Sequence, residues 1–287
     1  MLIESPAKLN LALLVLGERR DGYHELLTLF HRVSLKDTLR LEKRDEGIRL
    51  SGAPLGVPKK KNLIVRAFHL LKRTYPFGGG VSVHLTKKIP VGGGLGGGSS
   101  NAAAFLVGMN RLFRLGLSKK ELTGLGSKLG ADVPFFISGG RHAIGRGRGD
   151  RIEPLTFKRR LWFLLLLRRG GLSTKKVYSS FRLPRPAPFL TGVTHDVKMA
   201  SAFLERGKLS EAARFLVNDL TASAEEISPS LKETRERISA LHLGICQMSG
   251  SGPTLFLIFP SRREALQALR RLRRHRRGQA VVLCHSY

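Results

Sequence analysis

The sequence predicts a protein of the α+β class that folds as two domains. The chain has 287 residues, about twice the length of a typical domain. Segments with strand and helix patterns follow one another along it without a long repeat, so the class is mixed. Hydrophobic residues make up 42% and charged residues 25%, as in an ordinary globular protein. No apolar run reaches the ~18 residues of a membrane-spanning helix.

The first segments predict strands and one helix. Residues 8–18 have apolar residues at both odd and even positions, which indicates a strand buried on both faces. A turn is expected after it, at 21–26. Alternation of polar and apolar residues predicts a half-exposed strand within 32–44 and a further strand within 79–90. Between these strands, residues 62–75 carry a broad apolar stripe at helical spacing, so we expect a helix.

A run of glycines follows the strand in 79–90. Six of the seven residues 92–98 are glycine, although glycine loses more conformational entropy on folding than any other residue. Ser99, Ser100 and Asn101 are of types that favour a helix N-cap, and strong helix formers come after them. The order is therefore strand, glycine loop and helix N-terminus.

Two more segments complete this half of the chain. Ser118 and Glu121 have the spacing of a capping box, which predicts the start of a helix over 117–130. Residues 131–140 are expected to form a short turn and a strand.

The composition shifts at 145–155, which is rich in glycine and charge. We take this stretch as the boundary between domains of residues 1–150 and 151–287, although its glycines could also serve a hairpin.

The second half is expected to alternate in the same way. The apolar run 161–167, bounded by arginine pairs, predicts a buried strand. Residues 246–259 are expected to form strand, turn and strand, and 280–285 a last strand. Helices are expected near 174–182, 194–206, 209–217, 228–241 and in the arginine-rich stretch 268–280.

The chain is strongly basic. It has 50 Lys and Arg against 21 Asp and Glu, a net charge of +29, which attracts nucleic acid, acidic membranes or phosphorylated metabolites. In the arginine-rich helix, Leu266, Leu269 and Leu272 define one apolar face. A solvated helix is the simpler interpretation. A basic nucleic-acid-binding protein is the alternative, although no zinc finger or RNP-like aromatic pattern accompanies the arginines.

The cysteines and the N-terminal residues indicate a reducing compartment. Cys246 and Cys284 form no CxxC pair and no zinc-ligand cluster, so we expect ordinary thiols. The first ten residues lack the basic region and the long apolar stretch of a signal peptide, so we expect a cytoplasmic protein.

The glycine loop has the pattern of a phosphate-binding site. Free backbone N–H groups at a helix N-terminus attract anions, and glycines let the backbone approach phosphate oxygens closely. No Lys follows the last glycine, so the loop is not a Walker A motif. Gly92, Gly94 and Gly97 satisfy G-x-G-x-x-G, but Glu121 lies in an expected helix start and not at the end of a second strand, as a dinucleotide site requires.

Together, four motifs resemble the superfamily of galactokinase, homoserine kinase, mevalonate kinase and phosphomevalonate kinase (GHMP kinases). They are "SPAKLNLALLVLGERRDGYHEL" (5–26), "PVGGGLGGGSSNAA" (90–103), "LGADVPFF" (129–136) and "MSGSGPTLF" (248–256). The doubled triple glycine resembles the branch that acts on 4-diphosphocytidyl-2-C-methyl-D-erythritol. The resemblance implies an N-terminal domain like ribosomal protein S5, a C-terminal ferredoxin-like domain and an active site in the cleft between them.

The resemblance also implies a reaction and its catalytic residues. The γ-phosphoryl group of ATP, with Mg²⁺, would pass to the C2 hydroxyl of the cytidine substrate in non-mevalonate isoprenoid biosynthesis. Asp132 is the implied base, and Lys8 is expected to pair with it and to steady the developing charge. Asn10, two residues further on the same strand face, is expected to bind substrate near the transferred group.

The remaining site residues are likewise implied by the family pattern. Tyr23 is expected to stack on cytosine and His24 to hydrogen-bond its edge, with Tyr178 on the other face and Thr174 nearby. Tyr178 could instead belong to a helix core, and Asn62, a candidate adenosine contact, could be a helix N-cap. Gly250 and Gly252 are expected to form a tight turn at the site. The residues implied for binding ATP are Asn62, Pro90, Val91, Gly92, Gly93, Gly94, Leu95, Gly96, Gly97, Gly98, Ser99 and Ser100.

Two other functions stay open at this point. One is a GHMP kinase for another alcohol, such as homoserine or mevalonate, against which the "DGYHEL" motif argues. The other is the nucleic-acid-binding protein. No residue is identified as a magnesium ligand, and the oligomeric state is not indicated.

Overall fold

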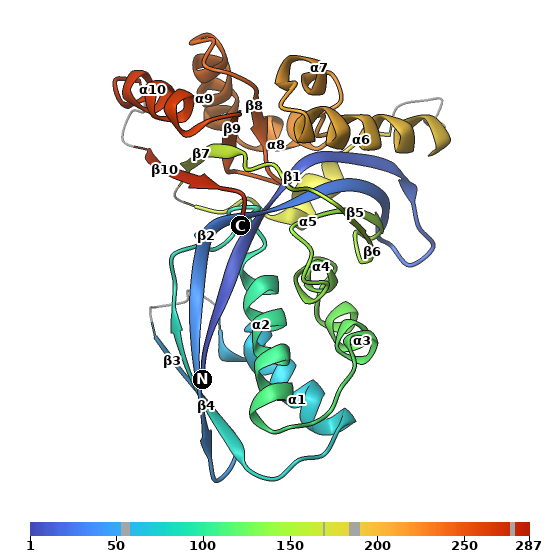
Figure 1. Ribbon diagram of the computed structural model, residues 1–287. Coiled ribbons are helices and arrows are strands. Elements are labelled where there is room, and N and C mark those ends of the chain that lie inside the picture. Colours follow the sequence, from blue (N-terminus) through green and yellow to red (C-terminus); the bar gives the residue numbers. More distant parts are fainter. Residues whose placement is uncertain (53–57, 169, 184–189, 276–278) are drawn as a thin grey trace.

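The computed structural model describes residues 1–52, 58–168, 170–183, 190–275 and 279–287. Figure 1 shows two sheets, each with helices packed beside it. No helix in these ranges is both long and apolar enough to cross a membrane.

The first sheet is built around a long hairpin of its two N-terminal strands. Its members are β1 (Leu2–Glu18), β2 (His24–Arg44), β3 (Ile48–Gly52), β4 (Gly80–Thr86), β5 (His142–Gly147) and β6 (Arg151–Leu155). The order is β3-β4-β2-β5-β6, with β1 paired antiparallel to β2. The alternation expected within 32–44 is present: Val33, Leu39 and Leu41 are fully buried.

Helices from the first half of the chain pack against this sheet (Figure 1). They are α1 (Leu63–Thr74), α2 (Gly97–Leu112), α3 (Lys119–Leu129) and α4 (Val133–Ile137). Asn62 caps α1 by accepting a hydrogen bond from the Ile64 amide at 2.9 Å. The capping box of Ser118 and Glu121 begins α3 as expected.

The second sheet has the ferredoxin-like strand order. It contains β7 (Trp162–Leu167), β8 (Cys246–Met248), β9 (Leu255–Phe259) and β10 (Ala280–His285). Its order, β10-β7-β9-β8, is 4-1-3-2 in chain order, and every neighbouring pair is antiparallel. This confirms the expected architecture of the C-terminal half.

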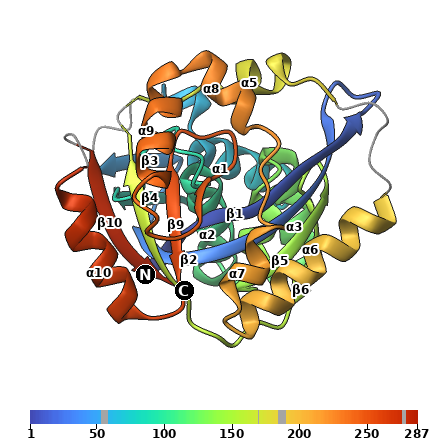
Figure 2. The ribbon, with the colours of Figure 1, turned by 90° about the horizontal axis from the view of Figure 1, so that it is seen from above.

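The helices of the second half lie around this sheet, as the view from above shows (Figure 2). They are α5 (Thr174–Ser180), α6 (Leu190–Glu205), α7 (Leu209–Ala213), α8 (Thr221–Ile227), α9 (Pro229–Ser239) and α10 (Arg262–Arg273). The buried face of α10 consists of Ala265, Ala268 and Leu272, while Leu266 is only half-buried. Cys246 and Cys284 are free thiols.

A shared hydrophobic core joins the two sheets. Leu9 and Leu29 of the first sheet pack with Phe163 and Phe256 of the second, and all four are fully buried. Separate clusters fill the space under α1–α4 and beneath α8–α10. The hairpin β1–β2 therefore contributes apolar residues to the interiors of both halves.

The structure corrects the expected strand in 131–140. The expected turn is present at 131–132, but residues 133–137 form the short helix α4 in place of a strand, with Pro134 in its first turn. Proline is favourable there because its missing N–H would be unpaired anyway. Val133, Phe135 and Phe136 favour a strand by composition, but all three are buried in the core under α2 and α3.

The stretch 145–155 is a hairpin, the alternative that the sequence left open. Its strands β5 and β6 pair antiparallel on either side of a turn at 148–150. A division at residue 150 would separate two strands of one sheet. The two-domain boundary at this position stays a prediction.

Candidate active site

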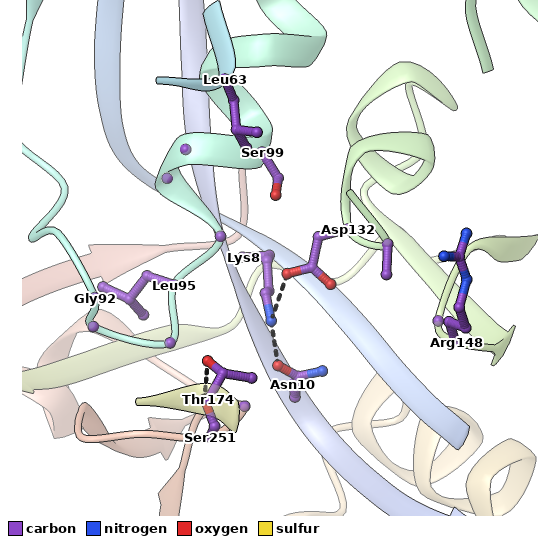
Figure 3. A pocket seen from close by; sticks show the side chains of 18 of the residues that line it. Lys8, Asn10, Leu63, Gly92, Leu95, Ser99, Asp132, Arg148, Thr174 and Ser251 are labelled. Carbon is purple, nitrogen blue, oxygen red and sulfur yellow. Dashed lines mark hydrogen bonds and ion pairs between the residues drawn. The ribbon is translucent and has the colours of Figure 1, made fainter. Parts of the chain in front are cut away.

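A cavity of about 890 Å³ lies where the glycine loop meets the hairpin β1–β2 and the start of α5. It gathers most of the residues that the family motifs singled out, but Ser100 and Gly252 are absent from its described lining. Figure 3 shows Lys8, Asp132 and Asn10 between the glycine loop on one side and Arg148 on the other. The sequence-predicted residues on its wall are Lys8, Asn10, Tyr23, His24, Asn62, residues 90–99, Asp132, Thr174, Tyr178 and Gly250.

The glycine loop is held between β1 and the turn after β8. The Lys8 amide donates to the Leu95 carbonyl at 3.0 Å, and the Ser249 hydroxyl donates to the Gly94 carbonyl at 3.0 Å. Gly94 has φ +75°, and a Cβ there would lie 2.2 Å from the Ser249 carbonyl oxygen. Only glycine fits this position, because a side chain would meet backbone that cannot move aside.

The helix after the loop begins earlier than the sequence indicated. Gly96 is the N-cap, in the left-handed region at φ +67°, and α2 starts at Gly97. The expected cap residues therefore lie inside the first turns, and none of them caps the helix. The first amides of a helix have no intrahelical acceptor, so the N-terminus of α2 presents free N–H groups and a partial positive charge to the cavity.

The two serines of the motif have different surroundings. Ser99 lies on the cavity wall (Figure 3). Ser100 is buried, its hydroxyl accepts a hydrogen bond from Ser5 at 2.8 Å, and its amide donates to the Gly96 carbonyl. Ser100 is not part of the cavity wall, because the helical repeat turns it toward β1.

Lys8 forms the expected ion pair with Asp132. The Lys8 Nζ atom is 3.3 Å from Asp132 Oδ2, and its side chain is only 4% exposed against 30% for Asp132. Lys8 also donates to Asn10 Oδ1 and lies over the Phe30 ring, 5.3 Å from its centroid. A nearly buried ammonium group requires such partners, whereas the carboxylate remains open to the cavity.

Asn10 is fixed by its neighbours on the hairpin. Its Nδ2 atom donates to Thr28 Oγ1 at 2.7 Å, and Thr28 donates to the Ala12 carbonyl. The Asn10 backbone amide donates to Ser249 Oγ at 3.3 Å. The same serine thus contacts both the hairpin and the glycine loop.

Aromatic side chains gather at the other end of the cavity. The rings of His24 and Tyr178 are 5.0 Å apart and tilted by 38°. Tyr23 is 55% exposed, and the Arg148 guanidinium lies 5.0 Å from the centre of its ring. Burial, with a smaller effect of the Asp132 charge, raises the pKa of the Tyr178 hydroxyl, which therefore stays protonated at neutral pH. Thr174 Oγ1 lies 2.9 Å from Ser251 Oγ.

Several basic residues on the cavity wall were not predicted from the sequence. Lys61, Lys87, Arg148 and Lys175 add cations to Lys8, while Asp132 is the one carboxylate among the described lining residues. In a chain with 50 Lys and Arg, no local pattern distinguishes these four from surface residues. Because these basic side chains line one cavity, the cavity is suited to bind a small molecule with several negative charges.

The described residues contain no group of three His, Cys, Asp or Glu side chains that could hold a metal ion.

Two family models match the chain. One describes the GHMP kinases N terminal domain and covers residues 62–140, and the other describes the GHMP kinases C terminal and covers residues 199–277.

Two curated relatives that match most of the chain carry the same name. A 4-diphosphocytidyl-2-C-methyl-D-erythritol kinase of Marinobacter nauticus is 38% identical over 265 residues, which are 90% of this chain and 85% of the relative. The protein of that name from Syntrophus aciditrophicus is 39% identical over 271 residues, 93% of this chain and 92% of the relative.

Solved structures agree with this relationship. A crystal structure of 4-(cytidine 5'-diphospho)-2C-methyl-D-erythritol kinase superposes with a TM-score of 0.82 at 35% identity, covering 99% of this chain and 98% of that one. Homoserine kinase from Cytophaga hutchinsonii, with a TM-score of 0.74 at 21% identity over 100% of this chain and 94% of that one, shares the fold. The chain therefore belongs to the GHMP kinases and, within them, to the 4-diphosphocytidyl-2-C-methyl-D-erythritol kinase family.

Proposed function

We propose that this enzyme transfers the γ-phosphoryl group of ATP to the C2 hydroxyl of 4-diphosphocytidyl-2-C-methyl-D-erythritol. The products are the 2-phosphate and ADP, and the reaction belongs to non-mevalonate isoprenoid precursor biosynthesis. One observation carries the proposal: the ion pair of Lys8 and Asp132 lies in a single cavity between a glycine-rich helix N-terminus and a cluster of aromatic side chains.

Asp132 is suited to take the proton of the substrate hydroxyl. A tertiary alcohol is a poor nucleophile, and a carboxylate that accepts its proton as the new O–P bond forms lowers the barrier. The bond between the γ-phosphorus and the bridging oxygen breaks at the same time, and ADP carries away the electron pair. Lys8, held by Asn10 and Asp132, supplies a fixed positive charge beside the reacting oxygens.

The ATP end of the site is assigned to the glycine loop. The first amides of α2 and the hydroxyl of Ser99 would contact phosphate oxygens, and Lys87 adds a charge beside them. Asn62 is a candidate for the adenosine, through its amide nitrogen, because its side-chain oxygen already accepts the Ile64 amide. Ser100 is excluded from this set by its burial against Ser5.

The cytidine end is assigned to the aromatic cluster. Tyr23 offers an exposed ring for stacking, and Tyr178 and His24, whose rings lie 5.0 Å apart, line the same cavity. Arg148 and Lys175 supply positive charge for the diphosphate. Thr174 is close enough to this end to contact the same substrate.

Mg²⁺ fits the site through the nucleotide. The lining offers the Asp132 carboxylate and the Ser99 hydroxyl, and Mg²⁺ in phosphoryl-transfer sites takes most of its other ligands from phosphates and water. When bound, the ion neutralises negative charge on the β- and γ-phosphates.

The test is a coupled assay for ADP with purified protein, ATP, Mg²⁺ and the cytidine substrate. We expect turnover with this alcohol and a kcat/KM at least 100-fold lower with homoserine or mevalonate, which lack a cytosine to stack on Tyr23. An absence of ADP above background, with an active family member as positive control, would refute the proposal. Higher activity with homoserine or mevalonate would assign the chain to another GHMP kinase. A cytoplasmic location remains a prediction.

A further inference from the structure

The buried carboxylate of Asp37 connects three segments that form the nucleotide end of the cavity. Asp37 lies in β2, and its side chain is fully buried. Its Oδ1 atom accepts the amides of Lys88 at 2.7 Å and Ile89 at 2.8 Å. Its Oδ2 atom accepts Lys87 Nζ at 2.5 Å and Asn101 Nδ2 at 2.9 Å. Two oxygens thus bind four donors.

These donors come from both sides of the glycine loop. Residues 87–89 link β4 to the loop, and Asn101 lies in the second turn of α2, just after the loop. Asn101 Nδ2 also donates to Ser5 Oγ at 2.8 Å, and Ser5 lies opposite Asp37 in the β1–β2 ladder. The carboxylate therefore ties the entrance and the exit of the loop to the hairpin that also carries Lys8.

The ion pair places a positive charge beneath the first residue of α2. A Cβ on Gly97 would lie 2.9 Å from Lys87 Nζ, so the ammonium group almost touches the helix N-terminus. Lys87 is 12% exposed and belongs to the cavity wall. Burial lowers the pKa of Lys87, and the hydrogen bond and charge of Asp37 oppose this shift.

We propose that Asp37 is a positioning residue for ATP. It holds Lys87 charged and fixed against the α2 N-terminus, so that the ammonium group and the loop amides converge on the same phosphates before the nucleotide arrives. This proposal rests on the proposed function only in taking ATP as the ligand of the loop.

The test compares nucleotide affinity in three variants. Asp37→Asn keeps one oxygen for the two amides but removes the charge and presents an N–H group to Lys87. We expect its Kd for a non-hydrolysable ATP analogue, measured by calorimetry, to rise at least ten-fold. The KM for the cytidine substrate should change less than two-fold. An Asp37→Asn protein that binds the analogue as wild type does would overturn the proposal.

Lys87→Met separates positioning from a general loss of folding. We expect the Kd of this variant for the analogue to be at least ten-fold higher than that of wild type. In the double variant, which adds Asp37→Asn to Lys87→Met, the Kd should rise less than two-fold further. This comparison remains decisive if the single Asp37→Asn protein fails to fold. If Asp37→Asn weakens analogue binding by the same factor in the wild-type protein and in Lys87→Met, Asp37 does not act through Lys87. Unchanged analogue affinity in Lys87→Met would show the same.

A matched control comes from the C-terminal half. Glu225 is a buried carboxylate paired with Arg235, and it is absent from the described cavity lining. Glu225→Gln should lower Tm while leaving the analogue Kd and both KM values unchanged. Calorimetry measures binding without turnover. If the wild-type protein binds the ATP analogue but does not phosphorylate the cytidine substrate, the proposed acceptor is wrong, and the proposed role of Asp37 is unaffected.

Discussion

At the scale of single residues, the site depends on a contrast between a buried cation and an accessible carboxylate. Lys8 is enclosed by Asn10, Phe30 and Asp132, whereas Asp132 keeps an open side toward the cavity. The lysine is thus fixed in place, and the carboxylate can reach a ligand. This division suits a fixed positive charge and a proton acceptor.

Asp132→Asn tests the proton acceptor. An amide of the same shape cannot take the hydroxyl proton, so we expect kcat to fall by about 10²- to 10⁴-fold with both KM values within a few-fold of wild type. Steady-state ADP assays measure this, with Asp196→Asn at an exposed position of α6 as the matched control. A kcat near that of wild type would remove Asp132 from the role of base.

Tyr23→Ala tests the stacking surface for cytosine. Stacking of a base on an aromatic ring contributes roughly 1–3 kcal/mol, so the KM for the cytidine substrate should rise by roughly 5- to 150-fold while the KM for ATP stays constant. Tyr23→Phe retains the ring and should behave like wild type. Equal effects on the two KM values would contradict a role specific to cytidine.

At the scale of elements, the glycine loop acts through its backbone conformation. The loop must pass close to the Ser249 carbonyl and then enter α2 from a left-handed residue. Each of these requirements excludes a side chain. The loop is thus held in one shape by its contacts with the Lys8 amide and the Ser249 hydroxyl.

Gly94→Ala tests this constraint. The new Cβ would meet the Ser249 carbonyl and adopt a positive φ, which costs of the order of 1–3 kcal/mol for the strained backbone. We expect the KM for ATP to rise about ten-fold or more.

The control for that variant is Gly124→Ala, within α3, where a Cβ meets nothing within 4 Å. Alanine in a helix interior should stabilise the protein by about 1 kcal/mol and leave the KM for ATP unchanged. An ATP KM in Gly94→Ala that matches this control would show that the loop tolerates a side chain there.

At the scale of the whole molecule, a chain of buried polar groups crosses between the two halves. His31 of β2 and His142 of β5 face each other with 2.9 Å between their Nδ1 atoms. His31 Nε2 reaches Ser286 Oγ near the C-terminus at 2.8 Å, and His142 Nε2 reaches Ser201 Oγ of α6 at 3.0 Å. Leu161 N donates to Ser286 Oγ, so the hydroxyl hydrogen of Ser286 is free to be donated to His31. With one neutral tautomer of each histidine, every ring nitrogen then has a hydrogen-bond partner.

This chain predicts a loss of stability in acid. Burial lowers the pKa of His142 to about 3 and that of His31 well below its ordinary value. Both pKa values lie below the ordinary value of about 6.5, so below pH 6.5 the unfolded chain binds more protons than the folded one, and stability falls as the pH drops. For His142 the contribution approaches about 1.4 kcal/mol per pH unit at pH values well below 6.5 and above about 3, and His31 contributes in the same direction.

Urea unfolding between pH 5 and 7 measures this dependence. His142→Gln should reduce the slope of the unfolding free energy against pH by about 1.4 kcal/mol per unit near pH 5, and by less as the pH approaches 7, where an unfolded histidine is mostly neutral. His69→Gln, at an exposed position of α1, is the matched control. A wild-type slope in His142→Gln would show that His142 is not among the groups that titrate on unfolding.

Much of this protein was determined by the sequence alone. The four motifs indicated the family and the pair Lys8 and Asp132, because both residues lie in short segments whose types are constrained locally. Periodicity located most strands and helices, since burial on one face imposes a spacing on any chain. It failed at α4, where apolar residues with strand propensity pack in a helix against α2 and α3.

Only the tertiary structure decided the rest. Asp37, Lys87 and Asn101 are far apart in the chain, and no local pattern marks a polar residue whose partners lie 50 to 64 positions away. Ser99 and Ser100 are adjacent and of the same type, yet one lies on the cavity wall and the other is bound to Ser5. Helix phase and packing against the hairpin set this difference, because the direction of a side chain depends on the neighbours that its element meets in space.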